Sequence, residues 1–143
     1  MGRQDIIKAA ERWLGARWHH QACVPYVLVD CGQLLNDVFA RCGFIDKVET
    51  QFCPRDWAAH RNSEQYLLDI VERHAQPVST PLPGDVAVWK FGRVFSHLAI
   101  VIDWPCIIHV DFYEGVTYAD ASKGKLATHE LRFYSVFNDE ASL

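Results

Sequence analysis

Three prolines and a glycine between residues 77 and 84 divide the chain into two parts with different periodicity. Proline lacks a backbone N–H, so a helix cannot continue through this segment. Before the segment, apolar residues recur about every 3.6 positions, and after it they alternate with a period near 2. The change predicts an α+β fold, in which N-terminal helices pack on a C-terminal antiparallel sheet of five to six strands.

Length and charge narrow the possible classes of function. A chain of 143 residues, 50% of them hydrophobic, can bury one sizeable core, so we expect a single domain over residues 1–143. The 14 Lys and Arg and the 18 Asp and Glu give a net charge of −4 without any basic block. We therefore expect no nucleic-acid partner and no membrane partner, because phosphates and anionic headgroups attract basic patches.

The first residues and the cysteines indicate the compartment. The chain begins with a mixed polar segment rather than the apolar stretch of a secretory signal, which predicts synthesis in the cytoplasm. The five cysteines are odd in number and irregularly spaced. This pattern argues against a disulfide framework and favours free thiols.

Three helices are predicted in the first part of the chain from apolar stripes and caps. The first has Ile6, Ile7, Ala10, Trp13 and Leu14 on its inner face and ends at Gly15; the second has Leu34, Leu35, Val38, Phe39 and Cys42, with a cap at Asp30 and an end at Gly43; the third has Leu67, Ile70, Val71 and His74 after a capping box of Asn62 and Gln65.

Five strands are predicted in the second part from alternating apolar residues and short loops. They cover residues 85–90, 97–102, 106–112, 116–120 and 131–137. The short connections predict an antiparallel meander.

Cys31 falls in the first turn of the second predicted helix, on the face that carries Leu34, Leu35 and Val38. Free N–H groups and the positive end of the helix dipole favour a thiolate there, so a lowered pKa is expected. The same N–H groups can stabilise an oxyanion. The alternative is that Cys31 is a small buried hydrophobic residue.

Two histidines in neighbouring predicted strands are the candidate partners of this thiol. His97 begins an apolar run, and His109 follows twelve residues later. If the two strands form a hairpin around Trp104 with an even register sum, both rings lie on one face, close enough for one to orient the other. The set comprises a nucleophile, a base and an orienting group, as acyl transfer through a thioester requires.

Four short motifs, in this order, resemble the NlpC-type papain-like cysteine peptidases that cleave bacterial cell-wall peptides. They are Asp30-Cys31-Gly32 at a helix start, Pro83-Gly84-Asp85-Val86 at a strand start, Ser96-His97-Leu98-Ala99-Ile100, and Ile107-Ile108-His109. The resemblance runs from about residue 15 to residue 137. It is closest to the short proteins of phage tails and gene transfer agents, because His20-Gln21-Ala22 begins eleven residues before Cys31.

The resemblance implies a papain-like fold and a peptidase with Cys31 as nucleophile, His97 as base and His109 as third polar residue. It implies hydrolysis of peptidoglycan stem peptides at a D-glutamyl to diamino acid bond, with no cofactor. Asp30, Trp18, His20, Gln21 and Ser96 are the candidate substrate-binding residues. Phage-tail-like proteins are implied as partners, with delivery to the cell wall by such a particle.

Three other interpretations stay open at this point. A thiol-dependent amidase or acyltransferase would use the same chemistry on another substrate. A catalytically silent tail-assembly module would keep the fold alone. A zinc site could be assembled from His19, His20, Cys23, Cys31, His97 and His109, although their spacing is unusual for zinc. The acids Asp111 and Glu114 are expected only to solvate a loop.

Overall fold

The change of periodicity in the sequence corresponds to a change from helices to strands. The computed structural model describes residues 2–19, 22–46 and 66–137. The N-terminal part contains α1 (Arg3–Glu11), α2 (Cys31–Arg41) and α3 (Tyr66–His74). A small sheet that the sequence did not predict lies between α1 and α2; its strands are β1 (Arg17–Trp18), β2 (Cys23–Val24) and β3 (Leu28–Val29).

The C-terminal part forms a six-stranded sheet with the order β4-β9-β5-β6-β7-β8, and all its pairs are antiparallel. This confirms the predicted α+β fold. The elements are β4 (Gln76–Val78), β5 (Val86–Phe91), β6 (Val94–Asp103), β7 (Cys106–Asp111), β8 (Gly115–Asp120), α4 (Gly124–Thr128) and β9 (Glu130–Ser135).

The sheet differs from a simple meander in two places. β9 does not continue beside β8 but lies between β4 and β5, because the chain crosses back through α4 after β8. β4 includes Pro77, in a segment that the sequence predicts as a connection. An edge strand tolerates proline because one side of its backbone needs no ladder hydrogen bonds.

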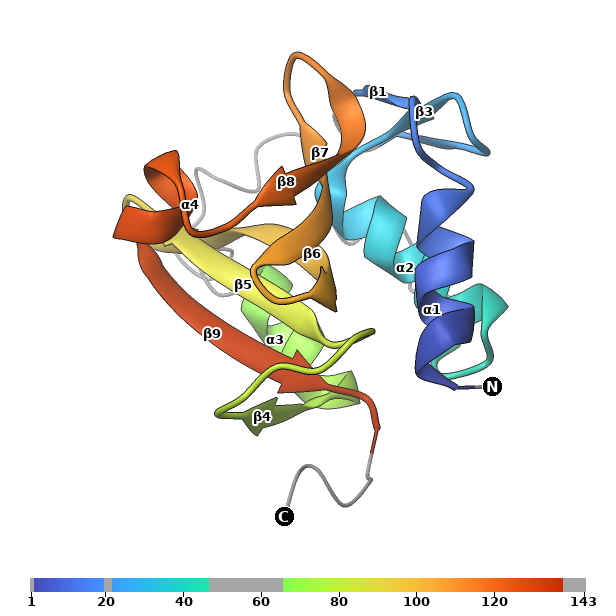
Figure 1. Ribbon diagram of the computed structural model, residues 1–143. Coiled ribbons are helices and arrows are strands. Elements are labelled where there is room, and N and C mark those ends of the chain that lie inside the picture. Colours follow the sequence, from blue (N-terminus) through green and yellow to red (C-terminus); the bar gives the residue numbers. More distant parts are fainter. Residues whose placement is uncertain (1, 20–21, 47–65, 138–143) are drawn as a thin grey trace.

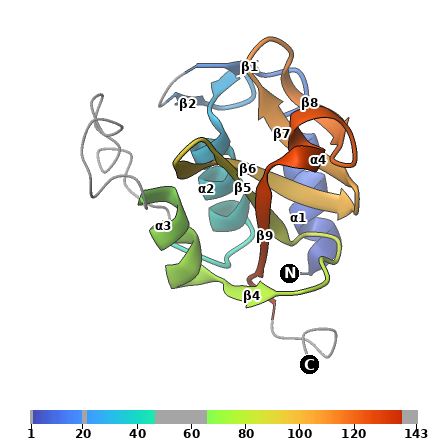
Figure 2. The same ribbon diagram turned by 90° about the vertical axis from the view of Figure 1, so that its left-hand side faces the viewer.

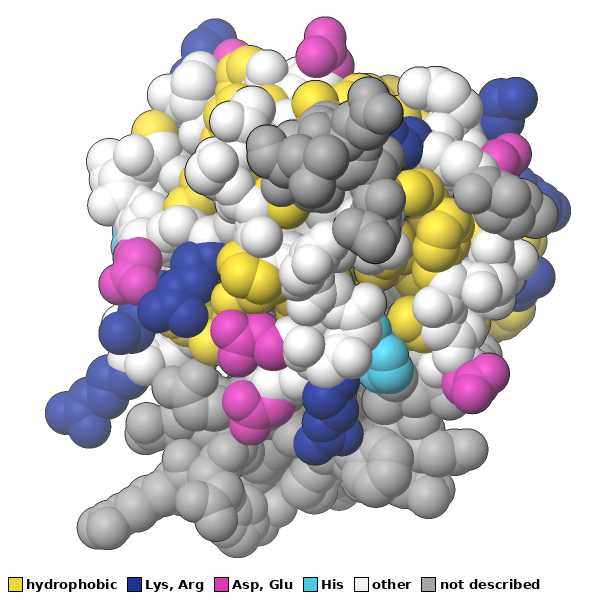
Figure 3. All heavy atoms as spheres, turned by 90° about the horizontal axis from the view of Figure 1, so that it is seen from below, with side chains coloured by type: hydrophobic (Ala, Val, Ile, Leu, Met, Phe, Trp, Pro, Cys, Tyr) yellow, Lys and Arg dark blue, Asp and Glu magenta, His cyan; other side chains and the backbone are white. Residues whose placement is uncertain are grey.

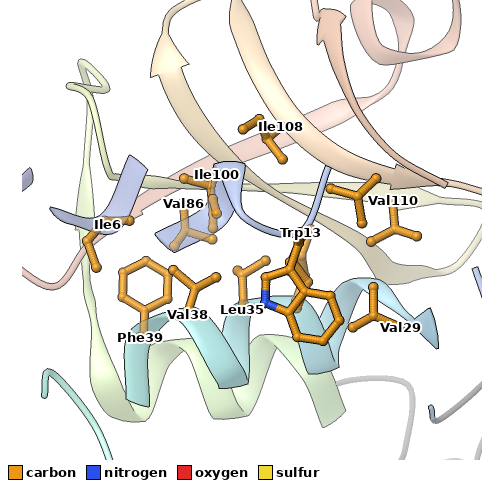
Figure 4. Close-up of a cluster of buried hydrophobic side chains, with 14 of the residues drawn as sticks. Ile6, Trp13, Val29, Leu35, Val38, Phe39, Val86, Ile100, Ile108 and Val110 are labelled. Atoms are coloured by element: carbon orange, nitrogen blue, oxygen red, sulfur yellow. The ribbon is translucent and has the colours of Figure 1, made fainter. Parts of the chain in front are cut away.

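Helices cover both faces of this sheet. Figures 1 and 2 show α1 and α2 on one side and α4 on the other. Between α2 and the sheet lies the larger hydrophobic cluster (Figure 4), which includes Val38, Phe39 and Ile100. A second cluster on the opposite face includes Trp89 and Val101, with Leu126 of α4 packed against it. Burial of both faces explains why β5, β6 and β7 contain consecutive buried apolar residues, and not only the alternating ones that a period near 2 predicts.

The predicted helices are present, with local corrections. α1 ends at Glu11, so Leu14 lies in the following turn and is 38% exposed rather than buried. In α3, Leu68 is buried, whereas His74 is exposed. The predicted capping box of Asn62 and Gln65 lies outside the described residues.

The surface agrees with the even distribution of charge in the sequence. Figure 3 shows acidic and basic side chains interspersed over one face of the molecule. Within the described ranges, no helix has the length and apolar character needed to cross a membrane.

Strand β6 contains two β-bulges that decide where its side chains point. Against β5, Trp89 pairs with His97 and Lys90 with Phe95, so Ser96 is an extra residue. Against β7, Val101 pairs with Ile107 and Asp103 with Cys106, so Ile102 is the second extra residue. A bulge changes which face the following side chains occupy and often lies beside a functional site.

The β7–β8 hairpin is fixed to the segment before β1 by a close backbone approach at Gly115. The backbone N–H of Val116 donates to the Ala16 carbonyl at 2.8 Å, and that of Gly15 donates to the Val116 carbonyl at 3.0 Å. A Cβ at position 115 would lie 2.1 Å from the Ala16 oxygen, and Gly115 has a φ of +78°. Only glycine fits there without a shift of backbone.

We predict that Gly115→Ala lowers the free energy of unfolding far more than Gly92→Ala. Gly92 also has a positive φ, +72°, but a Cβ there would meet nothing within 4 Å. Gly92→Ala should therefore cost only the left-handed conformation, about 1–2 kcal/mol, and Gly115→Ala at least about twice as much, since backbone must move. Urea unfolding of both variants measures the difference, and equal losses would contradict the proposed steric cause.

Candidate active site

The candidate nucleophile lies at the N-terminus of α2, as predicted. Asp30 has an extended backbone and caps the helix, because its Oδ1 accepts a hydrogen bond from the Gln33 backbone N–H at 2.8 Å. This cap fixes the first turn, in which Cys31 is the first helical residue. The helix body contacts β6 and β7, the two strands that carry the histidines.

The thiol of Cys31 contacts the β6 backbone directly beside His97. Its Sγ donates a hydrogen bond to the Ser96 carbonyl oxygen at 3.6 Å. Ser96 is the extra residue of the first bulge, so the irregular part of β6 turns its carbonyl toward the helix. In the described part of the chain, Cys31 makes this backbone hydrogen bond and none to the His97 ring. Proton transfer from the thiol to His97 thus stays a prediction.

The two histidines meet as the sequence predicts. Nε2 of His97 and Nδ1 of His109 are 2.8 Å apart, and the ring centroids are 5.0 Å apart with the planes nearly perpendicular. The β6–β7 register pairs Ala99 with His109, which makes His97 the diagonal neighbour of His109 on the same face. The shared face depends on the bulge at Ile102, because the unbulged hairpin register would put the rings on opposite faces.

Aromatic rings enclose the rest of His97. Phe91 stacks on it with centroids 5.5 Å apart, and Trp89 lies 5.7 Å away in a tilted arrangement. Burial is the largest cause that lowers the pKa of His97, and the charge of His109 is the second; with the opposing charge of Asp111 the pKa is about 4. His109 is itself buried, which lowers its pKa in turn. Both rings are therefore neutral at neutral pH.

The pKa of Cys31 differs from the sequence prediction. Desolvation by the surrounding protein is the largest cause that raises it and the Asp30 carboxylate is the second; together with the opposing backbone N–H groups they leave the pKa at about 12. The backbone N–H groups of Leu98, Gly32 and Cys31 lower the pKa, as a helix N-terminus should, but burial outweighs them. The predicted lowering is therefore wrong, and at neutral pH the Cys31 thiol and both imidazoles are neutral.

The candidate substrate-binding residues fall into three groups. Ser96 and Asp30 are in contact with the site through the thiol hydrogen bond and the helix cap. Trp18, in β1, is half-buried and packs on the exposed Phe112 with centroids 4.6 Å apart. His20 and Gln21 lie outside the described residues.

Sequence reasoning missed the aromatic neighbours Phe91 and Trp89 and the acid Asp111. Because β5 pairs with β6, alternation places Trp89 and Phe91 on the same face as His97 once the register is known. Asp111 follows His109 by two positions, which is the spacing of one strand face. That spacing was the available signal for Asp111.

Among the described residues, the candidates for a zinc site do not form a metal-binding group, and His20 lies outside these residues. Among residues 2–19, 22–46 and 66–137, no three His, Cys, Asp or Glu side chains are grouped as a metal ion would require. In the same ranges, Cys31, Cys42 and Cys106 are free thiols.

Comparison of the sequence with known proteins found neither a matching family model nor a matching curated protein. Comparison of the structure found similar folds. The NlpC/p60 domain of the peptidoglycan hydrolase SagA has a TM-score of 0.62 at 14% identity, over 92% of this chain and 97% of that domain. A lipoprotein-like protein of the NLP/P60 family from Staphylococcus aureus has a TM-score of 0.67 at 19% identity, over 96% of this chain and 42% of that one.

NlpC1 from Trichomonas vaginalis has a TM-score of 0.63 at 16% identity, over 91% of this chain and 43% of that one. The chain thus spans nearly all of the SagA domain but less than half of the other two proteins. These likenesses show that the chain has the papain-like α+β fold of NlpC/p60 domains.

We predict slow alkylation of Cys31 at neutral pH. Because the pKa of its thiol is raised, the reactive thiolate is scarce near pH 7 and increases as the pH rises well above 9. Iodoacetamide labelling between pH 6 and pH 10.5, followed by peptide mass spectrometry, measures the profile. The same peptide in urea-unfolded protein serves as control, and should react faster at pH 7.5. A labelling rate already at its maximum by pH 7 would instead indicate a thiolate–imidazolium pair.

Proposed function

We propose that the protein is a cysteine hydrolase that cleaves amide bonds in peptidoglycan stem peptides through a thioester intermediate. The observation that carries the proposal is the hydrogen bond between His109 on β7 and His97 on β6, the strand whose backbone accepts a hydrogen bond from the Cys31 thiol. The NlpC/p60 fold, which SagA uses in a peptidoglycan hydrolase, supports the same substrate class.

The ring nitrogen that carries the proton determines the role of each histidine in the proposed reaction. Nε2 of His97 faces Nδ1 of His109, which leaves Nδ1 of His97 without a hydrogen-bond partner among the described residues. If His97 carries its proton on Nε2 and donates it to His109, Nδ1 is the basic nitrogen available to the thiol. His109 then acts as the acceptor that holds the ring in this tautomer. The neutral state of both rings fits these tasks.

The proposed reaction has two steps, acylation of Cys31 and hydrolysis of the resulting thioester. A turn about the Cys31 side chain moves Sγ from the Ser96 carbonyl toward His97; Sγ then bonds to the substrate carbonyl carbon while its proton passes to Nδ1 of His97. The C–N bond breaks as His97 gives that proton to the leaving amine, and a thioester remains. Water, deprotonated by His97, hydrolyses the thioester and restores the thiol. Backbone N–H groups at the start of α2 stabilise the oxyanion.

The finer features of the substrate rest on the sequence resemblance. We propose the D-glutamyl to diamino acid bond as the target, with Asp30 beside the free amine and the Trp18–Phe112 pair along the substrate path. Association with a phage-tail-like particle, and delivery by it from the cytoplasm to the cell wall, is a hypothesis that His20-Gln21-Ala22 alone supports. An amidase or acyltransferase acting on another acyl group is the second candidate, since the same three side chains would serve it.

We predict graded losses of hydrolysis when the three side chains are changed. Cys31→Ser should abolish cleavage of purified muropeptides, and His97→Ala should lower kcat/KM by roughly 100-fold to 10,000-fold, the usual contribution of a general base. His109→Ala should cost less than His97→Ala, because His109 only orients the base. Cys106→Ser changes a thiol at the far end of β7 and serves as the control that keeps activity. Cleavage that survives Cys31→Ser would refute the mechanism.

We also predict an unusually low acidic limit of activity. The base must be unprotonated, and the pKa of His97 is lowered to about 4, so kcat/KM should fall only as the pH drops through that region. A histidine with an ordinary pKa would lose activity below about pH 6.5. Rates measured from pH 3.5 to pH 9 distinguish the two, with circular dichroism at each pH to verify folding.

A further inference from the structure

Asp111 lies on the same sheet face as the two histidines, although the sequence suggested no role for it beyond the loop. In β7, Asp111 follows His109 by two positions and so points to the same side. The β6–β7 register pairs Ala99 with His109. Continued by two residues, the same register brings Asp111 opposite His97.

Two backbone hydrogen bonds hold the Asp111 carboxylate in place. Its Oδ2 accepts from the N–H groups of Tyr113 and Glu114, both at 2.8 Å. The side chain is half-buried, at the point where β7 leads into the hairpin that Gly115 fixes against Ala16. A carboxylate whose oxygen accepts from two consecutive N–H groups cannot turn to another direction without breaking these bonds.

We propose that Asp111 is a positioning residue whose negative charge stabilises the imidazolium that forms on His97 during acyl transfer. The inference rests on the proposed function. His109 is the neutral acceptor of the His97 proton, so the pair itself holds no anion. Asp111 supplies the missing negative charge on the same face, as the carboxylate of other catalytic sets does for its imidazolium.

The electrostatics agree with this placement. The Asp111 carboxylate opposes burial and raises the pKa of both His97 and His109. In return, the pKa of Asp111 is lowered, first by the Glu114 N–H and then, among other causes, by the two histidines. The carboxylate therefore stays charged at every pH at which His97 acts as a base.

Other ionisable groups also surround the histidines. Glu114, in the loop after β7, raises the pKa of His109. Cys31, at the start of α2 after Asp30, hydrogen-bonds to the carbonyl of Ser96, which precedes His97 in the chain. His129, at the end of α4, reaches His97 only through the ring of Phe91. Asp111 is the carboxylate in this set that acts on both histidines.

Asp111→Asn separates charge from structure. An asparagine oxygen can accept the same two backbone N–H bonds, so the loop is kept while the charge is lost. Asp111→Ser, whose hydroxyl can also accept a backbone N–H, is the second variant if Asp111→Asn fails to fold. Asp103→Asn removes the same charge at the other end of β6 and is the matched control.

Histidine ring signals followed by NMR between pH 3 and pH 8 measure the coupling without substrate. Without the negative charge the protonated ring is less stable, so the pKa of the pair should fall in Asp111→Asn and stay unchanged in Asp103→Asn. With muropeptides, kcat/KM should fall about threefold to tenfold, with its acidic limb moved to lower pH. A merely structural role would lower the rate without moving that limb.

Two outcomes are decisive and distinct. If the wild type is active but the histidine pKa values are the same in the wild type and in Asp111→Asn, the proposed role of Asp111 is overturned. Absence of muropeptide cleavage by the folded wild type would overturn the proposed function, whatever the titration shows. A fall of both the pKa and kcat/KM in Asp111→Asn, with Asp103→Asn unchanged, supports the role.

Discussion

Strand β6 is buried on both faces, and this double burial is the constraint on which the site depends. Leu98 and Ile100 pack into the cluster beneath the helices, whereas Ala99 and Val101 pack into the cluster on the other face. A slip of one residue would exchange these two sets and put small and large side chains into the wrong core. The register against β7 is therefore fixed, and with it the 2.8 Å contact between His97 and His109. The geometry of the site is thus determined by hydrophobic packing some distance from the reacting atoms.

Burial also determines the charge state of the site. The packing that brings the half-buried Cys31 against the Ser96 carbonyl shields its thiol from much of the solvent, and the rings of Phe91 and Trp89 do the same for the half-buried His97. Each shift favours the neutral form, upward for the thiol and downward for the imidazole. In the proposed mechanism, such a site creates its charges only during the reaction, so that groups able to stabilise a transient cation or anion matter more than a preformed ion pair.

Local sequence signals predicted the local structure well. The cap at Asp30 and the stripe of Leu34, Leu35 and Val38 depend only on neighbours along the helix, and the structure has both. The strand positions followed from alternation for the same reason. The return of β9 to the edge of β5 was not predictable in this way, because it depends on a crossover through α4 that leaves no periodic signal. The prediction of a lowered pKa for Cys31 was wrong, because the helix dipole is a local effect, whereas desolvation depends on the whole fold. The contact between the two histidines was predicted correctly. The bulge at Ile102, which brings both rings to the same face of the sheet, was not predicted.

The bulge at Ser96 has a consequence for how this strand can change over evolution. Phe95 and Leu98 both point into the helix-side core although their positions differ in parity, because the extra residue between them reverses the alternation. Deletion or insertion of a single residue in this stretch would turn Phe95 out of that core or rotate His97 away from His109. Relatives that keep the chemistry should accordingly vary the identity of Ser96 far more freely than the length of the segment around it.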